Sequence, residues 1–166
     1  MPVMRSGVVA DGEAVQRFKR ATSGGPSTHE FSTTAGTSRR MGKVRQRGTA
    51  PELIVRRAVR RIGLHYRLRN RDLPGSPDLA NRSRRFAVFV HGCFWHQHLH
   101  CPRATVPKRN RGFWVAKFAA NRARDDRSVE ALRQLGYTVL VVWECETADP
   151  DALTAQLTRG LFRHGR

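Results

Sequence analysis

The chain has 166 residues, the length of one ordinary domain, and a formal net charge of +18. Its three cysteines are too few for a disulfide scaffold, and it contains no run of about 18 apolar residues that could span a membrane. We therefore expect a reducing, cytoplasmic compartment, no membrane association and a polyanionic partner, nucleic acid first. An arginine-rich composition that reflects only codon bias is the alternative explanation of the charge.

The first 36 residues differ in composition from the rest of the chain. They are rich in Gly, Ser and Thr and hold four Arg/Lys against three Asp/Glu, a net of +1, so the other 130 residues carry +17. We interpret 1–36 as a mostly disordered extension and 37–166 as the folded domain. Residues 37–48 form a basic arm with two apolar side chains, Met41 and Val44.

The predicted elements begin at a capping box, in which Thr49 is the N-cap and Glu52 the N3 residue. A helix follows to Ile62, and Gly63 ends it. Strands are then expected at 64–69, 78–80 and 85–90, a helix at 112–135, a strand at 137–143 and a last helix at about 150–162. The crossover from 85–90 through a helix to 137–143 predicts a βαβ unit, and the whole order predicts an α/β sandwich with a mixed sheet.

Cysteine and histidine gather in one short stretch after the third strand. Cys93, His98 and Cys101 lie close together, and Cys145 follows the last strand, which a mixed sheet brings back to the same edge. Four such ligands suit tetrahedral zinc in a structural site. Two alternatives stay open: His100 in place of His98, and buried thiols without a metal.

Oxygen ligands are expected at the start of the second strand. Asp78 follows Pro77 there, and antiparallel pairing puts it beside the end of the next strand, at Val90 and His91. The Asp78 carboxylate and the main-chain oxygen of Val90 can therefore face one Mg²⁺. His96 lies near the same edge, which strengthens the prediction.

Asp125 lies midway along the long predicted helix. It either pairs with arginines on the helix surface or orients His91 for proton transfer. Its neighbour Asp126 cannot share its face of the helix.

Four segments, PGSPD, FVHGCFWH, FWVAKFAANRARD and LVVWEC, together resemble the very short patch repair (Vsr) mismatch endonucleases. The resemblance covers about Thr37–Cys145. It implies a restriction-endonuclease-like fold with a structural zinc, and Mg²⁺-dependent nicking of the T strand at a T·G mismatch left by deamination of 5-methylcytosine. It also implies double-stranded DNA as substrate, a functional link to a cytosine-5 DNA methyltransferase, and a bacterial, nucleoid-associated protein. We expect a monomer, because one nick needs one active site.

The same resemblance assigns roles to individual residues. Asp78 and the Val90 main-chain oxygen would hold Mg²⁺, and His96 would act as general base on the attacking water. His91, paired with Asp125, would assist at the phosphate, and Glu52 would lie at the edge of the site. The zinc ligands would be Cys93, His98, Cys101 and Cys145. The apolar residues that enter the DNA stack as a wedge would be Phe94, Trp95, Met41 and Val44.

Two other functions fit parts of the pattern. A zinc-stabilised DNA-binding module without catalysis would explain the charge and the cysteines, but it has no need of both Asp78 and His96. A different nuclease could use the whole His/Cys cluster to bind one catalytic metal. Chelation separates these hypotheses, because loss of a structural zinc should unfold the protein.

Overall fold

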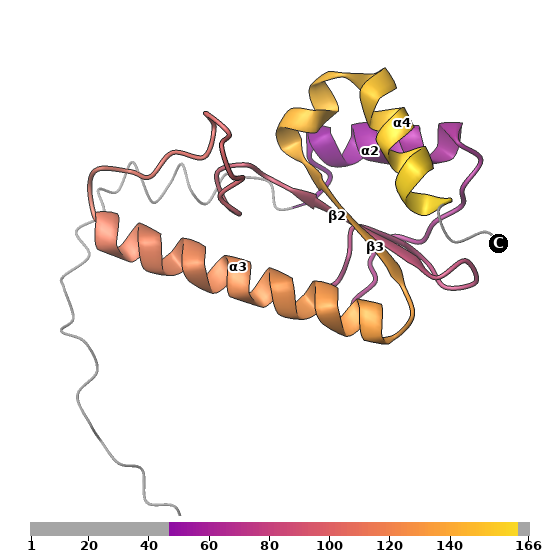
Figure 1. Ribbon diagram of the computed structural model, residues 1–166, viewed down its shortest axis with the longest axis horizontal. Coiled ribbons are helices and arrows are strands. Elements are labelled where there is room, and N and C mark those ends of the chain that lie inside the picture. Colours follow the sequence, from indigo (N-terminus) through magenta and orange to yellow (C-terminus); the bar gives the residue numbers. More distant parts are fainter. Residues whose placement is uncertain (1–46, 163–166) are drawn as a thin grey trace, which may run out of the picture. The chain divides into compact units, whose positions relative to one another are not determined.

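The computed structural model describes residues 47–162 (Figure 1). The predicted extension 1–36 and most of the arm 37–48, with Met41 and Val44, lie outside the described residues. In the part that is described, every helix is too short or too polar to cross a bilayer.

Helix α2 (Ala50–Arg61) begins at the predicted capping box. The Thr49 hydroxyl oxygen accepts a hydrogen bond from the Glu52 N–H, and the Glu52 carboxylate accepts one from the Thr49 N–H, both at 3.4 Å. Val55, Ala58 and Val59 form the buried stripe of the helix. The predicted helix is therefore confirmed to within one residue at each end.

Three strands form one mixed sheet in the order β1–β2–β3. Strand β1 (Leu79–Asn81) runs antiparallel to β2 (Phe86–His91), and β2 runs parallel to β3 (Thr138–Trp143). Helix α3 (Arg111–Gln134) makes the crossover between the parallel strands. This confirms the predicted βαβ unit and the α/β class.

The strand predicted at 64–69 was wrong. In this segment the described structure has only one bridge, in which Arg67 and Ala80 exchange backbone hydrogen bonds of 2.7 and 3.1 Å. Arg69 then takes a left-handed conformation (φ 59°), which turns the chain away from the sheet, and Leu68 is exposed. The alternating pattern is real, but the pairing with β1 is limited to Arg67, and the chain turns at Arg69.

The two faces of the sheet are covered by different helices (Figure 1). Phe86 and Val88 of β2 pack in the core shared with α2 and α4 (Pro150–Leu161). Ala87 and Phe89, which point to the opposite face, pack with Leu132 of α3. A short 3-10 helix, η1 (Glu144–Ala148), joins β3 to α4.

Candidate active site and metal cluster

A cleft of about 1040 Å³ opens among the start of α2, the segment before β1, the end of β2 and one side of α3. The predicted site residues that line it are Glu52, Asp78, Val90, His91, Trp95, His96 and Asp125. Basic side chains share the lining, namely those of Arg47, Lys117 and Arg124. The fold therefore gathers residues from four separate segments of the sequence into one cleft, which is lined by both acidic and basic side chains.

Asp78 lies beside the end of β2, as the antiparallel pairing predicts. Leu79 pairs with Val88, and the next contact is a hydrogen bond of 2.7 Å from the Val90 N–H to Asp78 Oδ2. Burial raises the pKa of Asp78 to about 6, and the negative charge of Glu52 adds to the rise, while the Val90 N–H opposes it. An ionised Asp78 is therefore costly until a positive charge reaches it.

Glu52 lies at the edge of the site, with 5% of its surface exposed. Its Oε2 accepts hydrogen bonds from the Gly48 N–H at 2.9 Å and from Arg56 Nη2 at 2.8 Å. Its Oε1 accepts one from the Thr49 hydroxyl at 3.0 Å. The carboxylate is thus committed to the helix cap and to Arg56.

His96 and Asp125 form a hydrogen-bonded pair across the cleft. His96 Nδ1 lies 2.5 Å from Asp125 Oδ2. Burial alone would raise the pKa of Asp125, but the hydrogen bond from His96 and the nearby positive charges bring it below its ordinary value. Because the ionised carboxylate can only accept a hydrogen bond, His96 Nδ1 is the donor, and Nε2 is the ring nitrogen left for other partners.

The structure differs here from the expectation that Asp125 pairs with His91. The His91 ring stacks on His96, with centroids 3.9 Å apart and planes 8° apart, and its edge meets Trp143. Burial, together with the charge of His96, lowers the pKa of His91 to about 4, so this ring is neutral at neutral pH. His91, His96 and Asp125 do lie together, but the hydrogen-bond partner of Asp125 is His96 and not His91.

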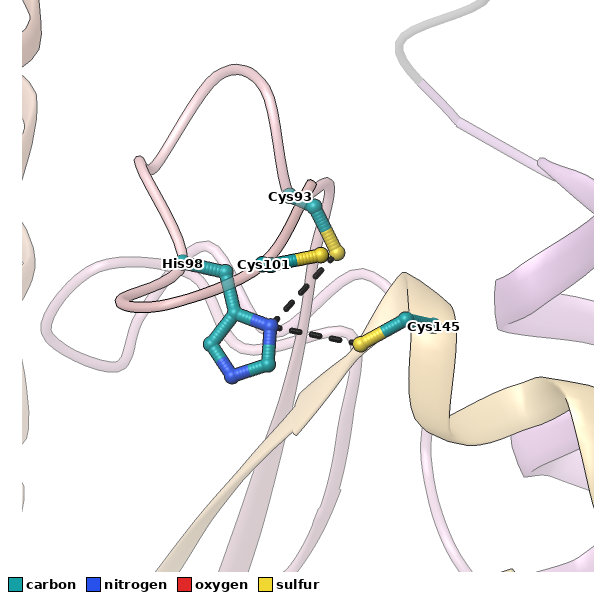
Figure 2. A group of neighbouring side chains, drawn as sticks. All are labelled: Cys93, His98, Cys101 and Cys145. Atoms are coloured by element: carbon teal, nitrogen blue, oxygen red, sulfur yellow. Dashed lines mark hydrogen bonds between the residues drawn. The ribbon is translucent and has the colours of Figure 1, made fainter. Parts of the chain in front are cut away.

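The four predicted zinc ligands converge at the end of the sheet (Figure 2). The ligand atoms of Cys93, His98, Cys101 and Cys145 lie within 4.8 Å of one another. His98 Nδ1 is 3.2 Å from Cys145 Sγ and 3.8 Å from Cys93 Sγ. In a tetrahedral zinc site these atoms are about 3.6 Å apart, so the set fits the ion. His100 is exposed and lies outside the group.

His91, His96 and Asp125 also lie within 4.8 Å of one another, but their geometry suits proton transfer better. Two ligand atoms on one tetrahedral ion are about 3.3 Å apart. The 2.5 Å between His96 and Asp125 is instead a hydrogen-bond length. Parallel imidazoles also direct their nitrogen lone pairs side by side rather than toward one ion.

Aromatic side chains form the wall of the cleft next to the His96–Asp125 pair. Phe94 packs edge-on against Trp95, Trp114 and Phe118, with centroid distances of 5.0, 5.6 and 5.3 Å. Phe94 and Trp95 are both half-buried, and Trp95 lines the cleft. Phe94 and Trp95, the two predicted wedge residues that the structure describes, are therefore anchored to α3.

Sequence reasoning missed three residues of this site. Lys117 lies over the Trp95 and Trp114 rings, its Nζ 5.8 and 5.6 Å from their centroids. Asn121 Nδ2 donates to the Trp95 carbonyl at 3.0 Å. Glu144 accepts from the Cys93 N–H at 3.4 Å. Lys117 and Asn121 precede Asp125 by eight and four residues, so helical spacing from Asp125 could have found them.

A partly buried carboxylate, an aspartate-oriented histidine and basic side chains in one cleft are the groups of an enzyme that hydrolyses phosphodiester bonds. Comparison with known proteins narrows this class. Residues 30–103 match the family model of the DNA mismatch endonuclease Vsr.

Several relatives match most of the chain. Type II nicking enzyme V.XorIIP of Xanthomonas oryzae pv. oryzae is 48% identical over 117 residues, 70% of this chain and 85% of that protein. The DNA mismatch endonuclease Vsr of Escherichia coli is 37% identical over 136 residues, 79% of this chain and 86% of that protein. Type II nicking enzyme V.NmeAIP of Neisseria meningitidis is 35% identical over 127 residues, 76% of this chain and 90% of that protein. The chain therefore belongs to the Vsr family of DNA mismatch endonucleases, and it is a DNA-cleaving hydrolase.

Proposed function

We propose that this endonuclease nicks the T strand at T·G mismatches that arise from deaminated 5-methylcytosine, with Mg²⁺ as the catalytic ion and zinc as a structural ion. The observation that carries the proposal is the presence of Asp78 and the His96–Asp125 pair in one cleft. A non-catalytic DNA-binding module has no need of this arrangement.

Asp78 and the main-chain oxygen of Val90 would hold Mg²⁺, an ion that prefers oxygen ligands. Burial of Asp78 disfavours its charge, and a bound cation would relieve that penalty. The Val90 N–H points at Asp78, and the N–H and C=O of one strand residue point to the same side. When bound, Mg²⁺ polarises the scissile phosphate and acidifies water.

His96 would take the proton of the attacking water at Nε2. Asp125 holds the ring by the bond at Nδ1, and its negative charge stabilises the imidazolium that forms. His91, neutral and stacked on His96, would donate a hydrogen bond to the phosphate. Glu52 would stay at the edge of the site.

The Cys93, His98, Cys101 and Cys145 cluster would hold zinc. Such an ion ties the loop after β2 to η1, and Trp95 and His96 lie in that loop between the first two ligands. The ion would therefore fix the catalytic base and the aromatic wall in one rigid segment.

The DNA would enter the cleft beside its aromatic wall. Phe94 and Trp95, with Met41 and Val44 from the arm, would wedge between bases at the mismatch, where unstacking costs least. Arg47, Lys117 and Arg124 offer positive charge to the phosphates. We further propose that the enzyme acts as a monomer on the bacterial nucleoid and repairs lesions left at the sites of a cytosine-5 DNA methyltransferase.

The test uses end-labelled duplexes with one T·G mismatch in varied sequence contexts, and matched T·A duplexes as controls. We expect a nick in the T strand alone, dependent on added Mg²⁺ and lost in EDTA. Mismatch-selective binding without a nick in any context would favour the binding module instead. Nicking that survives EDTA would refute the role of Mg²⁺.

A further inference from the structure

Arg56 lies one helical turn after Glu52 on α2 and forms a largely buried ion pair with it. The exposed fractions of the two side chains are 21% and 6%, and Nη2 lies 2.8 Å from Glu52 Oε2. The Nε atom of Arg56 is fully buried and has no hydrogen-bond partner within the described residues. A buried ion pair with an unsatisfied donor generally destabilises a fold relative to apolar side chains of the same size. Glu52 lines the cleft, so its pairing with Arg56 affects the charge of that wall.

The hydrogen bonds of Glu52 show what the pair does to that carboxylate. One oxygen accepts from the Gly48 N–H and from Arg56, and the other accepts from the hydroxyl and N–H of Thr49. A carboxylate has about four lone-pair directions. Glu52 therefore has none left for a metal ion, although it lines the cleft.

Glu52 and Asp78 line the same cleft, so the ion pair and the carboxylate of Asp78 belong to one site. The charge of Glu52 raises the pKa of Asp78 and the charge of Arg56 lowers it, so the two effects oppose each other. Glu52 and Arg56 carry opposite formal charges, so the ion pair as a whole adds no net charge to the site.

We propose that Arg56 is a positioning residue, which neutralises Glu52 and holds it in the helix cap so that Asp78 alone of the two carboxylates binds the divalent cation. The inference rests on the Mg²⁺ site of the proposed function. It states which charged side chains of that site offset each other and which one binds the ion. It places Glu52 outside the ligand set.

The test is a double-mutant cycle on the full-length protein with its zinc retained. Mg²⁺ is titrated, and the dissociation constant is obtained from calorimetry and from the rise of the melting temperature with Mg²⁺ concentration. The variants are Arg56→Met, Glu52→Gln and the two combined. Arg57→Met is the matched control, because it removes the same charge from an exposed position of the same helix.

The two single variants should change the dissociation constant for Mg²⁺ in opposite directions. Arg56→Met should tighten Mg²⁺ binding about tenfold, since a positive charge near a partly buried divalent cation disappears. Glu52→Gln should weaken binding by a similar factor, because Arg56 is then unbalanced. The double variant should return to within about twofold of the wild type. The control should change little, and Arg56→Lys should stay near the wild type.

A purely structural role for Arg56 would not tighten Mg²⁺ binding, so unchanged binding in Arg56→Met overturns the proposal. A double variant as weak as Glu52→Gln would show that Glu52 is itself a ligand, which also overturns it. If Arg56→Met does not fold, the comparison of Glu52→Gln with the double variant decides, because the proposal requires the double variant to bind Mg²⁺ more tightly than Glu52→Gln. A failure of the proposed function gives a different result, because the wild-type protein itself then binds no Mg²⁺ in the titration.

Discussion

Asp78→Asn should raise the stability of the metal-free protein while it abolishes nicking. The amide keeps an oxygen that can accept from the Val90 N–H, but it removes a carboxylate whose ionised form burial disfavours. Burial raises the pKa of Asp78 from 3.8 to about 6. One pKa unit corresponds to about 1.4 kcal/mol, so the ionised carboxylate lowers the free energy of unfolding at pH 7 by about 3 kcal/mol.

The pH dependence follows from the sign of this shift. Because the folded-state pKa of Asp78 lies above the unfolded-state value, the penalty is fully present above about pH 6 and vanishes below about pH 4. At pH 5 it should be about half as large as at pH 7. The advantage of Asp78→Asn should therefore shrink as the pH falls.

Thermal and urea unfolding of the zinc-loaded protein, without other divalent cations, measures the effect. Burial of the amide offsets part of the gain, so we expect 1–3 kcal/mol, or about 5 °C in melting temperature. Asp126→Asn, at an exposed neighbour of Asp125, serves as the control. A variant that is less stable than the wild type at pH 7, or a difference that does not shrink at pH 5, would refute the reasoning.

Three further predictions concern the catalytic pair, the metal cluster and a close approach in the fold. Asp125→Asn should lower the nicking rate about 10²–10⁴-fold with DNA affinity retained, because His96 loses the partner that fixes its tautomer; equal rates in a single-turnover assay would contradict this role. Cys145→Ser should lose zinc, measured by elemental analysis, and melt at a lower temperature; retention of one zinc per chain would contradict the cluster. Gly75→Ala should lower the free energy of unfolding by about 1–3 kcal/mol, because its Cβ would lie 2.5 Å from the Ser128 Cβ and its φ is 71°. Gly63→Ala, with a similar φ of 75° but no atom within 4 Å, should lose less, and an equal loss would show that the contact is unimportant.

Local sequence signals were sufficient for the helices, for β2 and β3, and for the three members of the Cys/His cluster that lie close together in the sequence. The capping box at Thr49 placed α2, because its hydrogen bonds join residues only three apart. The apolar runs placed β2 and β3, and the close spacing of Cys93, His98 and Cys101 brought these residues together almost without help from the fold. The antiparallel turn between β1 and β2 likewise made the contact of Asp78 with Val90 predictable.

Contacts between distant segments required the tertiary structure. Asp125 is 29 residues from His96, and which of the two histidines it meets depends on the position and rotation of α3 over the loop, which no local pattern encodes. The alternation at 64–69 did not become a strand, because only Arg67 pairs with β1 and the left-handed conformation of Arg69 then turns the chain. The opposite effects of Glu52 and Arg56 on the pKa of Asp78 could not be predicted from the sequence for the same reason. The sequence by itself determined which residue types lie near each strand end and helix cap, since those interactions span a few residues. Only the packed fold decided which charges face each other, since that depends on how whole elements lie against the sheet.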